Sequence, residues 1–293
     1  MSYCRDGDSC NRLKPVDQIP LQSILKETPM SERHKDGSAG DANYATIGTG
    51  YSMLRQPEPR VAAFINSALG DSRIVLNVGA GAGSYEPLDR EVVAVEPSAS
   101  MRAQRPSHLP TAIDAIAEKL PFGNQHFDAS MATFTVHQWS DLNAGLREMR
   151  RVTRGAVVIL TCDPTKVQDF WLNLYAPEVL ATEVRRYPSL EQITSIMGGH
   201  SEIQSVPIPL QCKDGFNEAY YGRPEKLIDK NTRMACSAWS FIEAHISEQY
   251  VQNLQRDITE GVWDSKFGHL RTQPEYNGSL RLVVSRQGST TGH

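Results

Sequence analysis

A glycine-rich turn that directly follows an apolar run constrains this chain more than any other feature. Residues 74–86 read IVLNVGAGAGSYE, with Gly79, Gly81 and Gly83 alternating after IVLNV. A short apolar run bounded by glycines predicts a buried strand and a tight turn, because glycine adopts backbone conformations that other residues avoid. In an open α/β sheet, ligands bind at the carboxyl ends of the strands. The turn therefore predicts a nucleoside-like ligand at this strand.

The spacing of the glycines and the next acidic residue narrow the choice of ligand. The turn reads G-x-G-x-G, whereas the dinucleotide fingerprint G-x-G-x-x-G would place its third glycine where Ser84 stands. Glu96 ends the next apolar run, VVAVEPS, where a carboxylate is expected to accept hydrogen bonds from both hydroxyls of a ribose. The pattern predicts a ribose-containing ligand and disfavours a nicotinamide dinucleotide.

Apolar runs alternate with helical patterns through the first half of the chain. The helical pattern SDLNAGLREMRRVT has Ser140 as its expected N-cap. Strands without polar alternation, separated by helices, predict a parallel sheet covered on both faces. The predicted strands are 74–78, 92–95, a weaker one at 110–113, 127–133, 156–161, the run EIQSVPIP at 202–209 and, closing the chain, 279–286.

Composition shifts along the chain predict three parts. Residues 1–45 are rich in Asp, Ser, Gly, Lys and Arg and predict a flexible N-terminal extension. Residues 46–209 together with 278–287 carry the strand and helix pattern of an α/β core. Residues 210–277 hold helical stretches without a clear strand, and we expect them to form a helical cap on the substrate side.

Together, these motifs resemble those of class I S-adenosylmethionine-dependent methyltransferases. The matching motifs are VLNVGAGAG, VAVEPS, AEKLPF, FDASMATFTVHQW and LREMRRVTRGAVVIL, in family order. The chain looks most similar to the bacterial small-molecule group that resembles the ubiquinone-biosynthesis type. The resemblance covers about 47–209 and the last strand. It implies a Rossmann-like, seven-stranded, mostly parallel sheet whose last strand is antiparallel, with the helical cap inserted before that strand.

The resemblance also implies a binding site for S-adenosylmethionine. Its cofactor residues would be Gly79, Ala80, Gly81 and Gly83 at the amino acid end, Glu96 at the ribose, Pro97, Met101, Ala117 and Glu118 around the adenine, and Thr133 and Phe134 on the methionine side. Asn77 and Ile116 stand where many members carry acidic residues. These two departures keep open the alternative of a cofactor-binding regulatory subunit without turnover.

The segment before the first predicted core helix holds two further cofactor candidates, Tyr51 and Arg55. In the family this amino-terminal segment folds over the cofactor. An arginine there could pair with the methionine carboxylate, because a guanidinium binds carboxylates through two parallel hydrogen bonds. The alternative for Arg55 is an ordinary solvated side chain in a loop.

His137 is the candidate catalytic residue. It follows the fourth strand in TVHQW, and its near-neutral pKa suits a general base for an oxygen or nitrogen acceptor. The alternative is that it packs on the cofactor or bonds a backbone carbonyl. Trp139, Trp171, Tyr175 and Tyr221 are the candidate substrate-binding aromatics, with packing in the core as their alternative.

Charge and cysteine usage exclude several classes of partner. The chain of 293 residues has a formal net charge of −4, so no strongly basic surface is expected to bind nucleic acid. No apolar run approaches the roughly 20 residues of a membrane-spanning helix, and we expect a cytoplasmic protein. The five cysteines include no CxxC pair, which argues against a disulfide framework and against a zinc site, so no metal is expected.

The predicted activity is transfer of a methyl group from S-adenosylmethionine to an O, N or C atom of a small, ring-containing molecule, with S-adenosylhomocysteine as product. The alternative within the same fold is an NAD(P)-dependent reductase, which the glycine spacing disfavours. The cap could also pair with a second copy, so a homodimer stays open.

Deletion of residues 1–45 is expected to leave folding and cofactor binding intact, because this polar segment precedes every predicted core element. Thermal unfolding and titration with S-adenosylmethionine, measured on the full and the shortened chain, test this. Loss of either property in the shortened chain would contradict the prediction.

Overall fold

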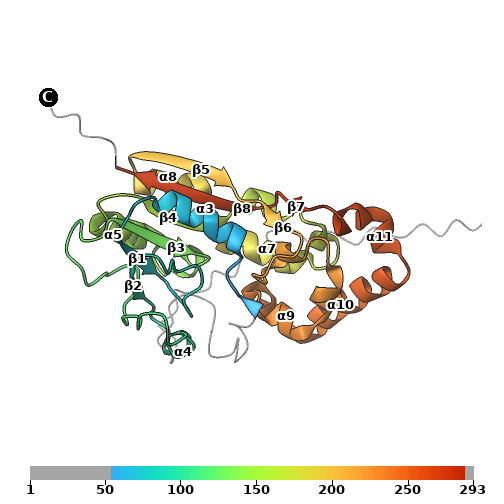
Figure 1. The fold of residues 1–293 in the computed structure, drawn as a ribbon. Coiled ribbons are helices and arrows are strands. Elements are labelled where there is room, and N and C mark those ends of the chain that lie inside the picture. The colour runs from blue at the N-terminus through green and yellow to red at the C-terminus, as the bar shows by residue number, and fades with distance from the viewer. Residues whose placement is uncertain (1–53, 288–293) are drawn as a thin grey trace, which may run out of the picture. The chain divides into compact units, whose positions relative to one another are not determined.

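The computed structural model describes residues 54–287, which all belong to one structural unit of the chain (Figure 1). The predicted extension, residues 1–45, and Tyr51 lie outside the described residues. Strands and helices alternate in the first part of this range, and helical segments then follow until the last strands. The strands are β1 (Ile74–Val78), β2 (Glu91–Val95), β3 (Ala129–Thr133), β4 (Val157–Cys162), β5 (His200–Ser205), β6 (Ile208–Pro209), β7 (Glu275–Tyr276) and β8 (Leu280–Arg286).

The central sheet contains six strands in the order β2-β1-β3-β4-β8-β5. Strands β1 to β4 pair in parallel, while β8 pairs antiparallel with both β4 and β5. The predicted antiparallel last strand is therefore confirmed. It lies inside the sheet, between β4 and the exposed edge strand β5.

The prediction of seven strands was wrong by one. The run 110–113 forms only a single bridge, in which Ile113 pairs with Val95 at the end of β2. The Ile113 amide donates to the Ala94 carbonyl at 2.9 Å, and its carbonyl accepts from the Glu96 amide at 3.0 Å. Pro110, three residues earlier, has no N–H with which to extend such a ladder. The outer position beside β2 is thus occupied by one residue instead of a strand.

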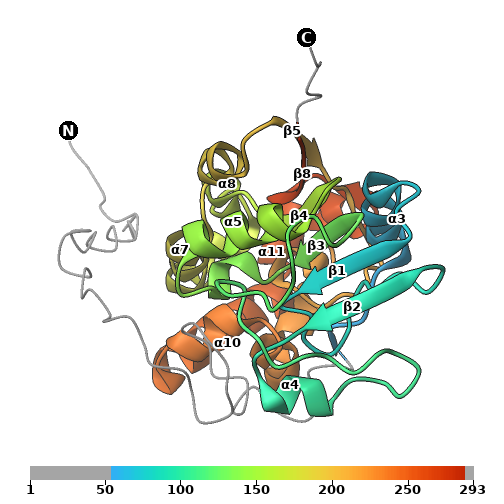
Figure 2. The same cartoon turned by 90° about the vertical axis from the view of Figure 1, so that its left-hand side faces the viewer.

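Helices cover both faces of this sheet. The helices are α3 (Pro59–Leu69), α4 (Ala99–Ala103), α5 (Leu142–Val152), α6 (Pro164–Val167), α7 (Pro177–Arg186), α8 (Leu190–Met197), α9 (Lys230–Met234), α10 (Ala244–Thr259) and α11 (Val262–Phe267). Figure 2 shows α3 on one face of the sheet and α5 and α8 on the other. Every side chain of β4 is buried, which explains its unbroken apolar sequence.

The ends of these helices follow local capping chemistry. Helix α3 begins with Pro59 after the N-cap Glu58 and ends at Gly70, whose φ is +56°. The N-cap of α5 is Asp141, one residue after the predicted Ser140. Asp141 caps the helix by accepting from the Ala144 amide at 3.0 Å, while the Ser140 hydroxyl donates to Glu118.

Between β6 and β7 the chain is helical. This segment holds α9, α10 and α11 and four 3₁₀ turns: η4 (Asn217–Tyr220), η5 (Pro224–Ile228), η6 (Ser237–Phe241) and η7 (Gly268–Arg271). Figure 1 shows α9, α10 and α11 beyond the end of the sheet at which the β5 arrow points, where the parallel strands end. Among residues 54–287, no helix has both the length and the apolarity needed to cross a membrane.

Aromatic side chains join this helical segment to the sheet. Trp263 of α11 is fully buried, and its ring lies 5.4 Å from the ring of Trp171 in the 3₁₀ turn η3 (Trp171–Leu174). The Arg271 guanidinium also packs on Trp263 and lies 4.9 Å from the centre of its ring. Trp263 thus connects two segments that are far apart in the sequence.

Replacing Trp263 with alanine should lower the free energy of unfolding by about 3–5 kcal/mol, because a large buried ring leaves a cavity. Denaturant unfolding measures this loss. Leu174→Ala is the control, since that side chain is 64% exposed and should change stability little. Equal effects of the two substitutions would contradict the proposed connection.

Candidate active site

A cavity with a volume of about 620 Å³ lies at the carboxyl ends of β1, β2 and β3. Every predicted cofactor residue within residues 54–287 lines it, as does Trp139. These residues are Arg55, Gly79, Ala80, Gly81, Gly83, Glu96, Pro97, Met101, Ala117, Glu118, Thr133 and Phe134. That they contact a cofactor stays a prediction, but the fold brings six separate sequence segments to one space.

The glycine turn depends on the lack of side chains. Gly79, Gly81 and Gly83 have φ angles of +67°, +52° and +94°, in the left-handed region that other residues rarely adopt. A Cβ on Gly79 would lie 2.1 Å from Thr135 Oγ1, and one on Gly83 would lie 2.3 Å from Leu109. Both the backbone conformation and the space around it therefore require glycine.

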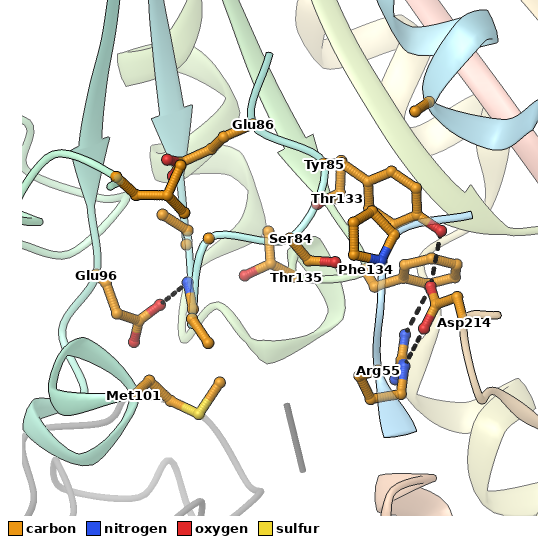
Figure 3. A pocket seen from close by; sticks show the side chains of 18 of the residues that line it. Arg55, Ser84, Tyr85, Glu86, Glu96, Met101, Thr133, Phe134, Thr135 and Asp214 are labelled. Carbon is orange, nitrogen blue, oxygen red and sulfur yellow. Dashed lines mark hydrogen bonds and ion pairs between the residues drawn. The ribbon is translucent and has the colours of Figure 1, made fainter. Parts of the chain in front are cut away.

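Glu96 fixes this turn from the end of β2. One carboxylate oxygen accepts from the Gly81 amide at 2.8 Å (Figure 3). The other accepts from the Ser98 amide, also at 2.8 Å. Burial raises the pKa of Glu96, while the two backbone hydrogen bonds act in the opposite direction. Each carboxylate oxygen can accept a further hydrogen bond. Glu96 can thus shape the turn and still bind hydroxyl groups of a ligand.

A carboxylate that the sequence analysis missed compensates for Asn77. The Asn77 amide donates to Glu86 Oε1 at 3.0 Å, and Arg105 donates to both oxygens of Glu86 at 3.0 and 2.8 Å. Glu86 and Arg105 are almost completely buried, and Glu86 lines the cavity. An acidic group is therefore present beside β1, although it comes from the segment after the turn.

Arg55 forms a buried ion pair. Its Nε donates to Asp214 at 2.5 Å, and the Tyr85 hydroxyl donates to the same carboxylate at 2.9 Å. Desolvation, followed by the charge of Asp214, raises the pKa of Tyr85 well above its usual value. The Arg55 guanidinium also lies 5.0 Å from the Phe134 ring centre. Figure 3 shows this group at one end of the cavity and Glu96 at the other.

Comparison with known proteins identifies a domain in this chain. Residues 76–160 match the family described as "Methyltransferase domain". A solved structure from Anabaena variabilis, described as a candidate methyltransferase from an antibiotic biosynthesis pathway, matches with a TM-score of 0.75 and 26% identity. The match covers 80% of this chain and 99% of that one.

Residues 76–160 therefore form a methyltransferase domain, and the fold around them is that of class I S-adenosylmethionine-dependent methyltransferases. The uncharacterized protein YafE of Escherichia coli K12 is 28% identical over 120 residues, which are 39% of this chain and 57% of that protein. The match thus spans little more than half of YafE. The narrower resemblance to the ubiquinone-biosynthesis group stays a prediction.

The candidate base of the methyltransferase domain, His137, lies in a second cavity of about 30 Å³. Its Nε2 lies 2.8 Å from Gln138 Nε2, and its ring centre lies 4.6 Å from that of Tyr187. Burial lowers the pKa of His137 well below its usual value, and the charges of Arg186 and Arg55 add to this effect. His137 is therefore neutral near pH 7, the form in which it can accept a proton.

Three predicted substrate aromatics of the methyltransferase domain lie in the core instead of at a cavity. Trp171 donates from Nε1 to the Tyr221 carbonyl at 2.9 Å, and Tyr221 donates from its hydroxyl to the Gln273 carbonyl at 2.6 Å. Tyr175 donates to Asp257 at 3.1 Å. All three aromatics are buried, because they fill the contact between the sheet and the helical segment. This corrects their assignment to the substrate.

The sequence analysis missed the cavity residues Tyr85, Glu86 and Asp214. Tyr85 and Glu86 directly follow the glycine turn, so their position there was a usable signal. Asp214 gave no local signal, because its partner Arg55 lies 159 residues away in the sequence.

Gly79→Ala should abolish binding of S-adenosylmethionine, because the new Cβ collides with Thr135 in addition to straining the backbone. Gly70→Ala is a matched control: Gly70 also has a positive φ, but a Cβ there meets nothing within 4 Å. The control should lose only about 1–2 kcal/mol of stability and keep binding. Calorimetric titration and denaturant unfolding measure both properties, and normal binding by Gly79→Ala would contradict the role of the turn.

Proposed function

We propose that the large cavity binds S-adenosylmethionine and that the protein transfers its methyl group to an O, N or C atom of a small, ring-containing molecule, releasing S-adenosylhomocysteine. One observation carries this proposal: every described residue that the sequence assigned to the cofactor lines the same cavity. The volume of about 620 Å³ falls within the usual range of ligand pockets, roughly 300–1,000 Å³.

The chemistry of the lining fits this cofactor. S-adenosylmethionine has no phosphate, so the turn does not need to bind an anion. It needs a backbone that can approach the cofactor closely, and Gly79 and Gly81 allow this because they have no side chains. Glu96 would accept from the ribose hydroxyls, and Met101 and Pro97 would contact the adenine. Glu86, beside Asn77, offers a carboxylate near the amino acid end. Arg55 would attract the methionine carboxylate while Asp214 holds its side chain.

When bound, the cofactor supplies an electrophilic methyl group on a sulfonium. The protein's contribution is to orient the acceptor and exclude water, which can lower the barrier by about 7–11 kcal/mol. We propose His137 as the candidate general base, because its imidazole is neutral near pH 7. Trp139, which lines the large cavity, is the candidate for contact with the acceptor ring.

We also propose that residues 210–277 act as a cap on the substrate side. Asp214, within this segment, lines the large cavity and bonds Arg55 and Tyr85. The Gly215 amide donates to the Leu54 carbonyl at 2.8 Å, so the cap segment also pairs with the backbone before α3. An enclosed site of this kind favours a small-molecule acceptor over nucleic acid or a membrane surface.

Glu96→Gln should weaken binding of S-adenosylmethionine and S-adenosylhomocysteine at least about tenfold, because the charged acceptor for the ribose hydroxyls is lost. Calorimetric titration with both compounds and with NADH tests this. Glu91→Gln, an exposed position on the same strand, is the control and should bind normally.

Two outcomes would contradict the proposed function. Binding of NADH alone would favour the reductase. Tight binding of S-adenosylmethionine without turnover of any acceptor in a screen with labelled methyl donor would favour a regulatory subunit.

A further inference from the structure

The small cavity beside the large one has features of a binding subsite. It has a volume of about 30 Å³, which is enough for one water-sized group. Arg55 and Phe134 line both cavities and therefore form the wall between them. Beyond this wall lie His137 of η2 (Val136–Gln138) and Glu183 of α7.

The polar atoms in this cavity are incompletely paired. Glu183 Oε1 accepts from the Asn217 side-chain amide at 2.8 Å, and this partner is neutral. His137 Nδ1 has no hydrogen-bond partner within the described range. The rest of the lining combines the rings of Phe134, Phe216 and Tyr187 with Arg55, Ala235, Cys236 and Ser237. Polar groups in such a position are normally satisfied by a ligand or a water.

We propose that this small cavity receives the hydrogen-bond donor of the methyl acceptor, an O–H or N–H group, and that Glu183 accepts that hydrogen bond. The inference rests on the proposed function and narrows it, because it restricts the acceptor atom to oxygen or nitrogen. The ring of the acceptor stays in the large cavity, since 30 Å³ has no room for it.

The electrostatics around Glu183 support this assignment. Desolvation and the charge of Glu218 raise the pKa of Glu183 to about 7, while the Asn217 hydrogen bond, Arg186 and Arg55 lower it. Other titratable groups near it are His137, Tyr187, Cys162 and Cys236. Glu183 therefore gains or loses its proton near neutral pH, which is the range in which a general base works best.

The step balances in atoms and charge. The acceptor oxygen or nitrogen forms a bond to the methyl carbon as the bond between that carbon and sulfur breaks. Sulfur keeps the electron pair of the broken bond and becomes a neutral thioether. The acceptor atom gives up its hydrogen as a proton, which passes to the Glu183 carboxylate. Glu183 takes this role in place of His137, because the Gln138 amide donates to His137 Nε2 and the neutral imidazole then carries its proton on Nδ1.

Binding of two probes to the protein loaded with S-adenosylhomocysteine tests the subsite. Phenol and anisole share a ring and differ in whether the oxygen carries a hydrogen or a methyl group. The wild-type protein should bind phenol at least about tenfold more tightly than anisole, because only phenol donates to Glu183. The preference should increase as the pH rises through about 7, where Glu183 ionises.

Glu183→Gln should reduce the preference for phenol, because a neutral amide oxygen replaces the carboxylate, and should abolish its dependence on pH. Glu218→Gln is the matched control: Glu218 is also buried and also has a pKa raised to about 7, but it bonds Ser279 through the backbone amide and the hydroxyl. This control should keep the preference and shift its pH dependence downward, because the negative charge that raises the pKa of Glu183 is gone.

The outcomes separate this inference from the proposed function. Equal binding of phenol and anisole by the wild-type protein overturns the subsite, as does an unchanged preference in Glu183→Gln. If Glu183→Gln does not fold, the wild-type protein still tests the inference. A preference for phenol that does not change between pH 6 and pH 8 would overturn it. Failure of the wild-type protein to bind S-adenosylhomocysteine overturns the proposed function instead.

Discussion

A buried carboxylate, Asp214, holds together the segments that border the site. It accepts from Arg55, before α3, and from Tyr85, just after the glycine turn. At 1% exposure, this carboxylate would be costly without partners, because an unpaired buried charge destabilises a protein by several kcal/mol. The amino-terminal segment, the turn and the cap must therefore meet in one arrangement. Both cavities lie against Arg55, so their shapes depend on this contact.

The buried acids of the site differ in what balances their charge. Glu86 is paired with Arg105 and Asp214 with Arg55, so their charges are offset by bonded cations. Glu96 relies on two backbone amides, which hold the glycine turn in place. Glu183 accepts a hydrogen bond from the neutral amide of Asn217, with Arg186 and Arg55 acting through their charges, and desolvation dominates its pKa. This difference explains why structural roles suit the first three and proton transfer suits Glu183.

The sequence was enough to predict features of the fold that depend on neighbouring residues. It was not enough to predict features that depend on packing between distant segments. Strand β1, the glycine turn and the position of Glu96 were predictable because apolar runs and glycines act through their own backbone. The strand at 110–113 was not, since one bridge to Val95 replaces it. The roles of Trp171 and Tyr221 were also open, because a buried aromatic and a ligand-binding aromatic have the same sequence signal.

The sequence by itself determined the α/β architecture, the turn with its three glycines and the segments that line the large cavity. These depend on hydrophobic periodicity and on backbone conformations that only glycine adopts readily. Only the tertiary structure decided that Asp214 joins Arg55 across 159 residues, and that Glu183 lies with His137 behind the wall of Arg55 and Phe134. Contacts between distant segments depend on how the helical cap packs on the sheet, and no local pattern of residues encodes that packing.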